Sequence, residues 1–141
     1  MTGNTTLKAS AGSLTLASAV DTQGNTLTVD GAGDMTFNGA INGPGGSLLK
    51  SGSGTLTLSA ANNHEAGTTL GAGTIVANHA DALAYNGNIS FTGGTLRYGT
   101  GITTDWSSRI ANSSGSVAID TNGNTVTFAS TLASTNTGGL A

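Results

Sequence analysis

SGSGTLTLSAANNHEAGTTLGAGTIVANHA, residues 51–80, has the pattern that indicates the fold of this chain most clearly. It contains two short runs of alternating apolar residues, GTLTL from Gly54 and GTIVA from Gly73. A third run, GTLRY, starts at Gly94, so the runs recur after 19 and then 21 residues. A period of about 20 residues is typical of one coil of a β-solenoid, in which successive coils stack on one another.

The alternation within each run predicts which side chains enter the core. Because successive side chains of a strand point to opposite faces, Leu56 faces inward when Thr55 and Thr57 face outward. Stacking then places Leu56 in line with Ile75 and Leu96 in a continuous apolar ladder. Ordering each residue costs about 1–2 kcal/mol, while each buried leucine returns only about 1.5–3 kcal/mol. One coil cannot meet this cost alone, so we predict several stacked coils that share one core.

Further short apolar runs predict strands along the whole chain, and nearly all are bounded by Gly, Asn, Asp or Ser, the usual turn residues. They lie at 5–9, 13–18, 25–29, 35–37, 47–50, 68–70, 88–91, 117–120 and 125–128. No window has the apolar spacing of a helix, and the nearest approach, 79–88, is predicted to be a loop. The sequence thus predicts an all-β chain in which residues 1–141 form one parallel β-solenoid segment. An antiparallel β-sandwich is the alternative, because the Asn-Gly pairs are also typical of hairpin turns.

A second internal similarity has a much longer spacing. The segment DTQGNTLTV from Asp21 returns as DTNGNTVTF from Asp120, 99 residues later. This similarity predicts a long period in addition to the short one. It also indicates a fragment cut from a longer repeat array.

The composition excludes several classes of protein and site. Only 8% of the residues are charged, against about 25% in an average globular domain, and the net charge is −3. The basic residues Lys8, Lys50, Arg97 and Arg109 are far apart in sequence, which argues against a nucleic-acid surface. There is no cysteine for a disulfide or thiolate site and no run of about 20 apolar residues for a membrane span. The opening residues lack the pattern of a signal peptide, so we expect any signal and translocator to lie outside this chain.

Residues 48–78 also resemble a known family, the autotransporter-associated β-strand repeat, also called the passenger-associated transport repeat. The resemblance covers most of 47–141 and, more weakly, 13–46. The family often has Tyr where this chain has His64. The residues that carry the resemblance are Lys50, Gly52, Gly54, Thr55, Leu56, Leu58, Asn62 or Asn63, Gly67, Thr69, Gly73 and Thr74.

The resemblance implies a right-handed parallel β-helix within the passenger of a large bacterial protein that is secreted or anchored at the outer-membrane surface. Members of the family are mostly adhesin-like, and the repeat is thought to support passenger folding and export without catalytic residues. We therefore expect a structural, non-enzymatic segment without cofactors. Its main partners would be the neighbouring coils of a parent chain.

One stretch, 97–109, gathers groups that are able to stack on sugars. It contains Arg97, Tyr98, Asp105, Trp106 and Arg109. A carbohydrate-binding or polysaccharide-degrading β-helix with a host or surface glycan as partner is therefore the alternative function. The structural interpretation is favoured here: Trp106 covers a loop, and Arg109 pairs with a nearby carboxylate.

Metal sites are not predicted. The segment around Asp34 is similar to a calcium-binding nonapeptide, but a single imperfect copy cannot supply ligands from successive turns. The residues His64, Glu65 and His79 lack the spacing of a metal pair and are interpreted as surface turns.

Two further hypotheses concern surfaces. Thr-x-Thr at 26–28, 55–57 and 125–127 would suit an ice-binding solenoid if these pairs formed one row, but Val76 and Arg97 interrupt such a row. The end coils of a solenoid expose unpaired strand edges. We therefore expect end-to-end self-association.

Overall fold

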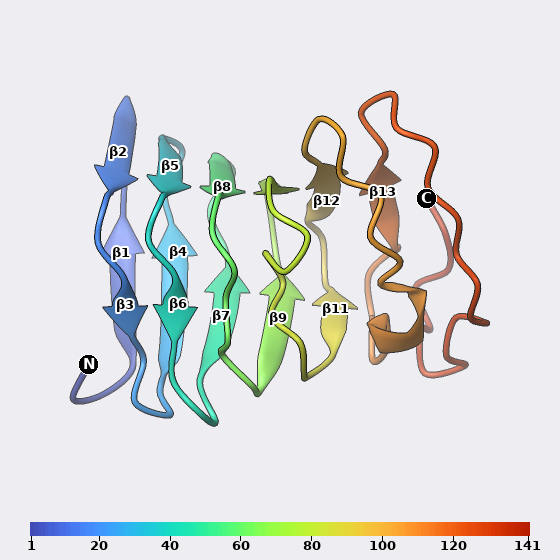
Figure 1. Cartoon of the computed structure of the whole chain (residues 1–141), viewed down its shortest axis with the longest axis horizontal. Helices are drawn as coiled ribbons and strands as arrows, with labels where there is room; N and C mark the ends of the chain where they lie inside the picture. The colour runs from blue at the N-terminus through green and yellow to red at the C-terminus, as the bar shows by residue number, and fades with distance from the viewer.

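The computed structural model describes residues 1–141 and shows an all-β solenoid of about six stacked coils of about 21 residues. The coils follow one another along the longest axis from the N-terminus to the C-terminus (Figure 1). Every strand pairing is parallel, which excludes the antiparallel sandwich. The only helix is a single 3-10 turn, η1 (Ser107–Arg109), and no helix has the length and apolarity needed to cross a membrane.

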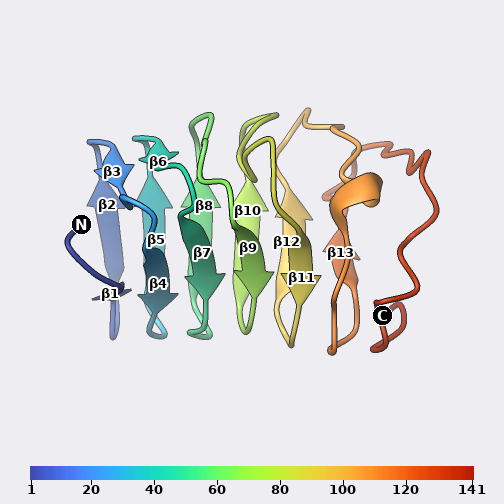
Figure 2. The ribbon, with the colours of Figure 1, turned by 90° about the horizontal axis from the view of Figure 1, so that it is seen from below.

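Two long parallel sheets form two sides of the solenoid, and both views show them running side by side along the stack (Figure 2). The first sheet contains, in spatial order, β1 (Thr5–Lys8), β4 (Thr26–Asp30), β7 (Ser47–Lys50), β9 (Gly67–Leu70) and β11 (Ile89–Phe91). The second sheet contains β2 (Ser13–Leu16), β5 (Asp34–Phe37), β8 (Thr55–Leu58), β10 (Thr74–Ala77), β12 (Thr95–Tyr98) and β13 (Ala118–Asp120). A third side begins with two short strands, β3 (Val20–Asp21) and β6 (Ile41–Asn42), and continues without strands.

The predicted apolar ladder is confirmed. Ile75 is in register with Leu56 on one side and Leu96 on the other, and all three side chains are fully buried. The ladder extends to Met35 in the preceding coil and to Ile119 in the following one. Because every second side chain of a strand points to the same face, the inward aliphatic residues of the strands lie in one continuous core.

The corner between the first and second sheets brings backbones of successive coils very close together. A Cβ added at Gly54 would overlap the carbonyl oxygen of Gly33 in the preceding coil, and one at Gly73 would overlap the carbonyl of Gly54. Gly52 meets Gly31 in the same way. The Gly-x-Gly pattern of the repeat is therefore a steric requirement of stacking.

The third side differs from the sequence-based prediction at its C-terminal end. Residues 125–128, predicted as a strand, form none, because the preceding coil offers them no regular ladder. Side chains bond the backbones together there instead: Asn124 Oδ1 accepts the Gly101 N–H, at 2.8 Å, and Asp105 Oδ2 accepts the Ala129 N–H, at 2.9 Å. The loop predicted at 79–88 is confirmed.

The corner glycines provide the first test. We expect Gly54→Ala to lower the free energy of unfolding by more than about 2 kcal/mol, because the new methyl group meets backbone that cannot move without separating two coils. Urea unfolding followed by circular dichroism measures the change. Gly3→Ala is the control, since a Cβ there meets nothing within 4 Å, and it should change stability by less than about 0.5 kcal/mol. Equal stability of the two variants would contradict the stacking requirement.

Candidate functional site

The two aromatic residues of the 97–109 stretch lie inside the solenoid. Tyr98 ends β12 with its ring fully buried, and Trp106 is 3% exposed. Their ring centroids are 4.7 Å apart with planes tilted by 32°, and the Tyr98 hydroxyl donates to the Thr104 carbonyl at 3.1 Å. Burial raises the pKa of the Tyr98 phenol. Neither ring is presented at the surface for stacking on a sugar.

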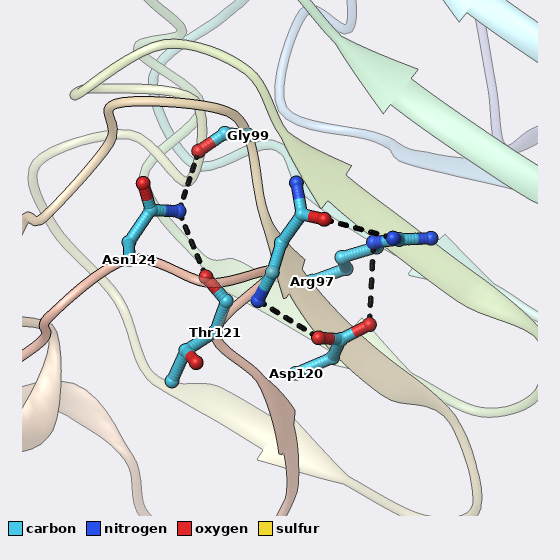
Figure 3. A network of polar contacts seen from close by, with 6 residues as sticks. Arg97, Gly99, Asp120, Thr121 and Asn124 are labelled. Carbon is cyan, nitrogen blue, oxygen red and sulfur yellow. Dashed lines mark hydrogen bonds and ion pairs between the residues drawn. The ribbon is translucent and has the colours of Figure 1, made fainter.

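Arg97 points outward from the same strand and belongs to a different environment. Its guanidinium forms an ion pair with Asp120, with Nε and Oδ2 3.2 Å apart, and donates to the Asn122 side chain at 2.8 Å (Figure 3). Asp120 also accepts the Asn122 N–H, and Asn124 donates to the Gly99 carbonyl of the preceding coil. This network fastens the turn after β13 onto the coil that contains β12.

That turn explains the 99-residue similarity. In both copies an Asp accepts the N–H two residues later, two successive residues have positive φ, and the Asn N–H and side chain both bond the Thr carbonyl. However, the first copy, residues 21–25, connects β3 to the first sheet. The second copy, residues 120–124, connects the second sheet to the third side. The long period is therefore wrong: one local turn sequence recurs at two different corners.

Asp105 and Arg109 hold coils together, each in its own way. Hydrogen bonds from Ser107 and from the Ala129 N–H lower the pKa of the Asp105 carboxyl. Arg109 does not pair with a carboxylate, contrary to the prediction. Its guanidinium donates instead to four backbone carbonyls of the loop at 79–88, those of Leu83, Ala84, Asn86 and Gly87, at 2.6–2.9 Å.

The third side of the repeat contains a buried polar group that the sequence did not indicate. His64, predicted at a surface turn, is fully buried, and its Nε2 lies 2.9 Å from the Thr68 hydroxyl. Its Nδ1 has no hydrogen-bond partner. The neighbouring Asn62 spans three coils, because its Oδ1 accepts the Ile41 N–H at 2.7 Å and its Nδ2 donates to the Ala82 carbonyl at 2.6 Å. The one feature of the sequence that set position 64 apart was the His in place of the Tyr that is frequent in the family.

Lys50 is a second buried polar residue that the sequence did not indicate. It occupies an inward position of β7, in register with Val29 and Leu70, and its side chain is 2% exposed. Its ammonium donates to the Gly52 carbonyl at the corner between the two sheets. Burial lowers the pKa of this amine, while the carboxylates of Asp30 and Asp34 oppose that shift. The Lys50 side chain thus stabilises the backbone of the corner that contains Gly52 and Gly54.

The threonine pairs do not form the row that ice binding requires. Thr26–Thr28 lies on β4 in the first sheet, Thr55–Thr57 lies on β8 in the second sheet, and 125–127 lies on the third side. On the second sheet Thr55, Thr74 and Thr95 do align. The adjacent column reads Thr57, Val76 and Arg97, with the interruptions that the sequence indicated.

No pocket is present, and no group of three or more His, Asp or Glu side chains is placed to hold a metal ion. Asp34 accepts the Thr55 N–H of the next coil at 2.8 Å, so its carboxylate is used in stacking. His79 and Asp81 lie together at partly exposed positions of the loop at 79–88, with His79 Nδ1 and Asp81 Oδ2 3.9 Å apart.

Comparison with protein families gives one match. Residues 48–77 fit the passenger-associated-transport-repeat family, so the chain contains one such repeat. In the structure the match runs from β7 through β10, and it includes Lys50, the glycine corners and the buried His64. Searches of curated proteins and of solved structures find no significant match.

His64 makes stability depend on pH. Burial, with a smaller contribution from the charge of Arg109, lowers the pKa of His64 from 6.5 to about 4. The unfolded chain therefore binds a proton below about pH 6.5, whereas the folded chain does so only below about pH 4. This contribution to stability is complete above pH 6.5 and is lost as the pH falls towards 4. We expect a loss of about 3 kcal/mol in the free energy of unfolding across this window.

Urea unfolding curves recorded between neutral pH and about pH 4 measure the loss. His64→Gln should remove most of the pH dependence between about pH 6.5 and 4.5. His79→Gln, at a partly exposed position, should retain it. The assignment is wrong if His64→Gln keeps the wild-type slope or if His79→Gln removes it.

Proposed function

We propose that this chain is a structural segment of an autotransporter-type passenger, secreted or displayed at the outer-membrane surface of a bacterium, and that it supports an adhesin-like parent protein. The observation that carries the proposal is the match of residues 48–77 to a passenger-associated repeat whose motif residues are the ones that stack the coils. The proposal concerns the scaffold and its folding and display. The binding specificity of the parent protein is a separate property.

The repeat supplies what a growing solenoid needs. Its inward residues Leu56, Leu58, Leu70 and Ile75 are all fully buried, each worth about 1.5–3 kcal/mol relative to exposure. Both edges of its strands are paired with neighbouring coils. A passenger needs such a unit because nearest-neighbour contacts alone hold a solenoid together.

We propose a non-catalytic role because the charged groups that the sequence singled out are engaged between coils. Arg97 bonds to Asp120 and Asn122 of the next coil, Asp105 to the N–H of Ala129, and Arg109 to the preceding loop. These contacts use the same atoms that would otherwise bind or polarise a ligand. The two aromatic rings that the glycan-binding alternative requires, those of Tyr98 and Trp106, are also buried.

Surface display tests the proposal. The chain is placed between a secretion signal and a translocator barrel in a bacterial host, and the amount of protease-resistant passenger at the surface is measured. Leu56→Asp puts a charge into the apolar ladder and should reduce display at least ten-fold, whereas Thr57→Asp, on the outer face of the same strand, should display normally. If Leu56→Asp is displayed as well as wild type, folding of this segment does not support export.

We also propose that the ends of the stack associate with another copy of this chain. The outer edges of β1 and β2 have no strand partner. Leu14 is 39% exposed at this end, although its ladder neighbour Met35 is buried, and Leu140 is 73% exposed in the last residues of the chain. Unpaired parallel edges beside open apolar ladders fit another coil of the same kind.

Light scattering over a range of concentrations tests this association. We expect wild-type mass to rise with concentration and Leu14→Lys to shift the midpoint to at least ten-fold higher concentration, because a charged side chain at an edge opposes pairing. Tyr85→Lys is the control, since Tyr85 is exposed on a loop away from both ends. A wild-type chain that stays monomeric at high concentration would contradict the association.

A further inference from the structure

The loop at 79–88 has little structure of its own. Within it the backbone forms two short turns, from the Ala82 N–H to the His79 carbonyl and from the Ala84 N–H to the Asp81 carbonyl. Ala84 has φ of 60°, a left-handed conformation that alanine adopts only when its surroundings impose it. Despite this, Leu83 and Ala84 are buried. Something outside the loop must therefore hold it in place.

Arg109 supplies that constraint from the next coil. Its Nη1 donates to the Ala84 carbonyl at 2.6 Å, and its Nη2 donates to the Leu83 and Asn86 carbonyls at 2.6 and 2.8 Å. Its Nε donates to the Gly87 carbonyl at 2.9 Å. One planar guanidinium thus satisfies four acceptors that the loop does not satisfy itself, in a fork geometry that a lysine ammonium cannot reproduce.

The loop covers the buried polar group of the preceding coil. The Asn62 N–H bonds the Asp81 carbonyl at 3.0 Å, and Gly87 packs on Gly67 so closely that a Cβ at Gly87 would overlap it. His64 lies between Asn62 and Gly67 in the sequence, is fully buried, and is close enough to Arg109 for the charge of that guanidinium to contribute to its lowered pKa. Closure of the loop and burial of His64 therefore belong to one state.

We infer that Arg109 is a latch that closes the loop at 79–88 over His64, so that the repeat at 48–77 reaches its closed form only after the following coil has folded. The latch is a property of the fold and does not depend on the passenger role proposed above. It makes two coils one cooperative unit through a residue outside the family match. The constraint runs from the later coil to the earlier one, because only Arg109 donates the four bonds.

Amide hydrogen exchange on the full chain tests the latch. In Arg109→Lys the positive charge remains but the fork is lost, and we expect the peptide spanning 79–88 to exchange at least ten-fold faster than in wild type. Chymotrypsin should cleave after the exposed Tyr85 at least ten-fold faster. Peptides from β4 and β5, two coils away from the loop at 79–88, should exchange as in wild type. Arg97→Gln, which removes the exposed ion pair with Asp120, is the control and should leave the loop unchanged.

The ring signals of His64 give an independent readout by NMR titration. In Arg109→Lys the pKa of His64 should rise from about 4 towards 6.5, because the open loop admits water while the local charge is preserved. The latch is wrong if the loop of Arg109→Lys exchanges like wild type. It is equally wrong if β4 and β5 accelerate as much as the loop, because Arg109 would then contribute only to global stability.

A measurement on the wild-type chain covers the case in which the variants do not fold. In low denaturant the loop must open whenever the coil carrying Arg109 opens, so the Ala82 and Ala84 amides should exchange at least as fast as those of Ile110 and Ala111. If the loop amides exchange more slowly, the loop stays closed without its latch and the inference is overturned.

Discussion

Each coil of this protein presents two edges of backbone N–H and C=O groups that only another coil can satisfy. An unpaired backbone group away from water costs as much as a lost hydrogen bond, so this requirement governs the rest of the structure. On the two sheet sides regular parallel ladders meet it. On the third side, where the coils vary in length, side chains such as Asn62, Asp105 and Asn124 take over the role of the ladder. The protein is therefore rich in Asn, Ser and Thr for a structural reason.

The parts of the fold that depend on regular spacing were predictable from sequence. Alternation within GTLTL and its return after about 20 residues placed Leu56, Ile75 and Leu96 in one ladder, and the structure confirms this register. The strand predicted at 125–128 was wrong although its local pattern was the same. A strand requires a partner as well as a pattern, and the coil before it has no strand at that position.

Short polar motifs specified local turns but did not predict how the coils are arranged. The sequence Asp-Thr-x-Gly-Asn specifies one turn through bonds among its own residues, so it serves any corner that needs that turn. Its recurrence after 99 residues consequently said nothing about the coil period. The burial of His64 and the role of Arg109 could not be read from local sequence either. Both depend on a loop that arrives from the next coil and on a guanidinium that arrives from the one after.

The buried polar groups raise the question of what they contribute beyond satisfying the backbone groups of neighbouring coils. A solenoid with similar strands in every coil can pair them in a wrong order, because Leu, Ile and Thr ladders tolerate each other's partners. Directional bonds do not have this tolerance. Asn62 must meet the Ile41 N–H and the Ala82 carbonyl at once, and Arg109 must meet four carbonyls of a single loop. These contacts form only when the coils are stacked in their native order. The apolar ladder thus supplies most of the stability, and the polar contacts of the third side select one arrangement from many of similar energy.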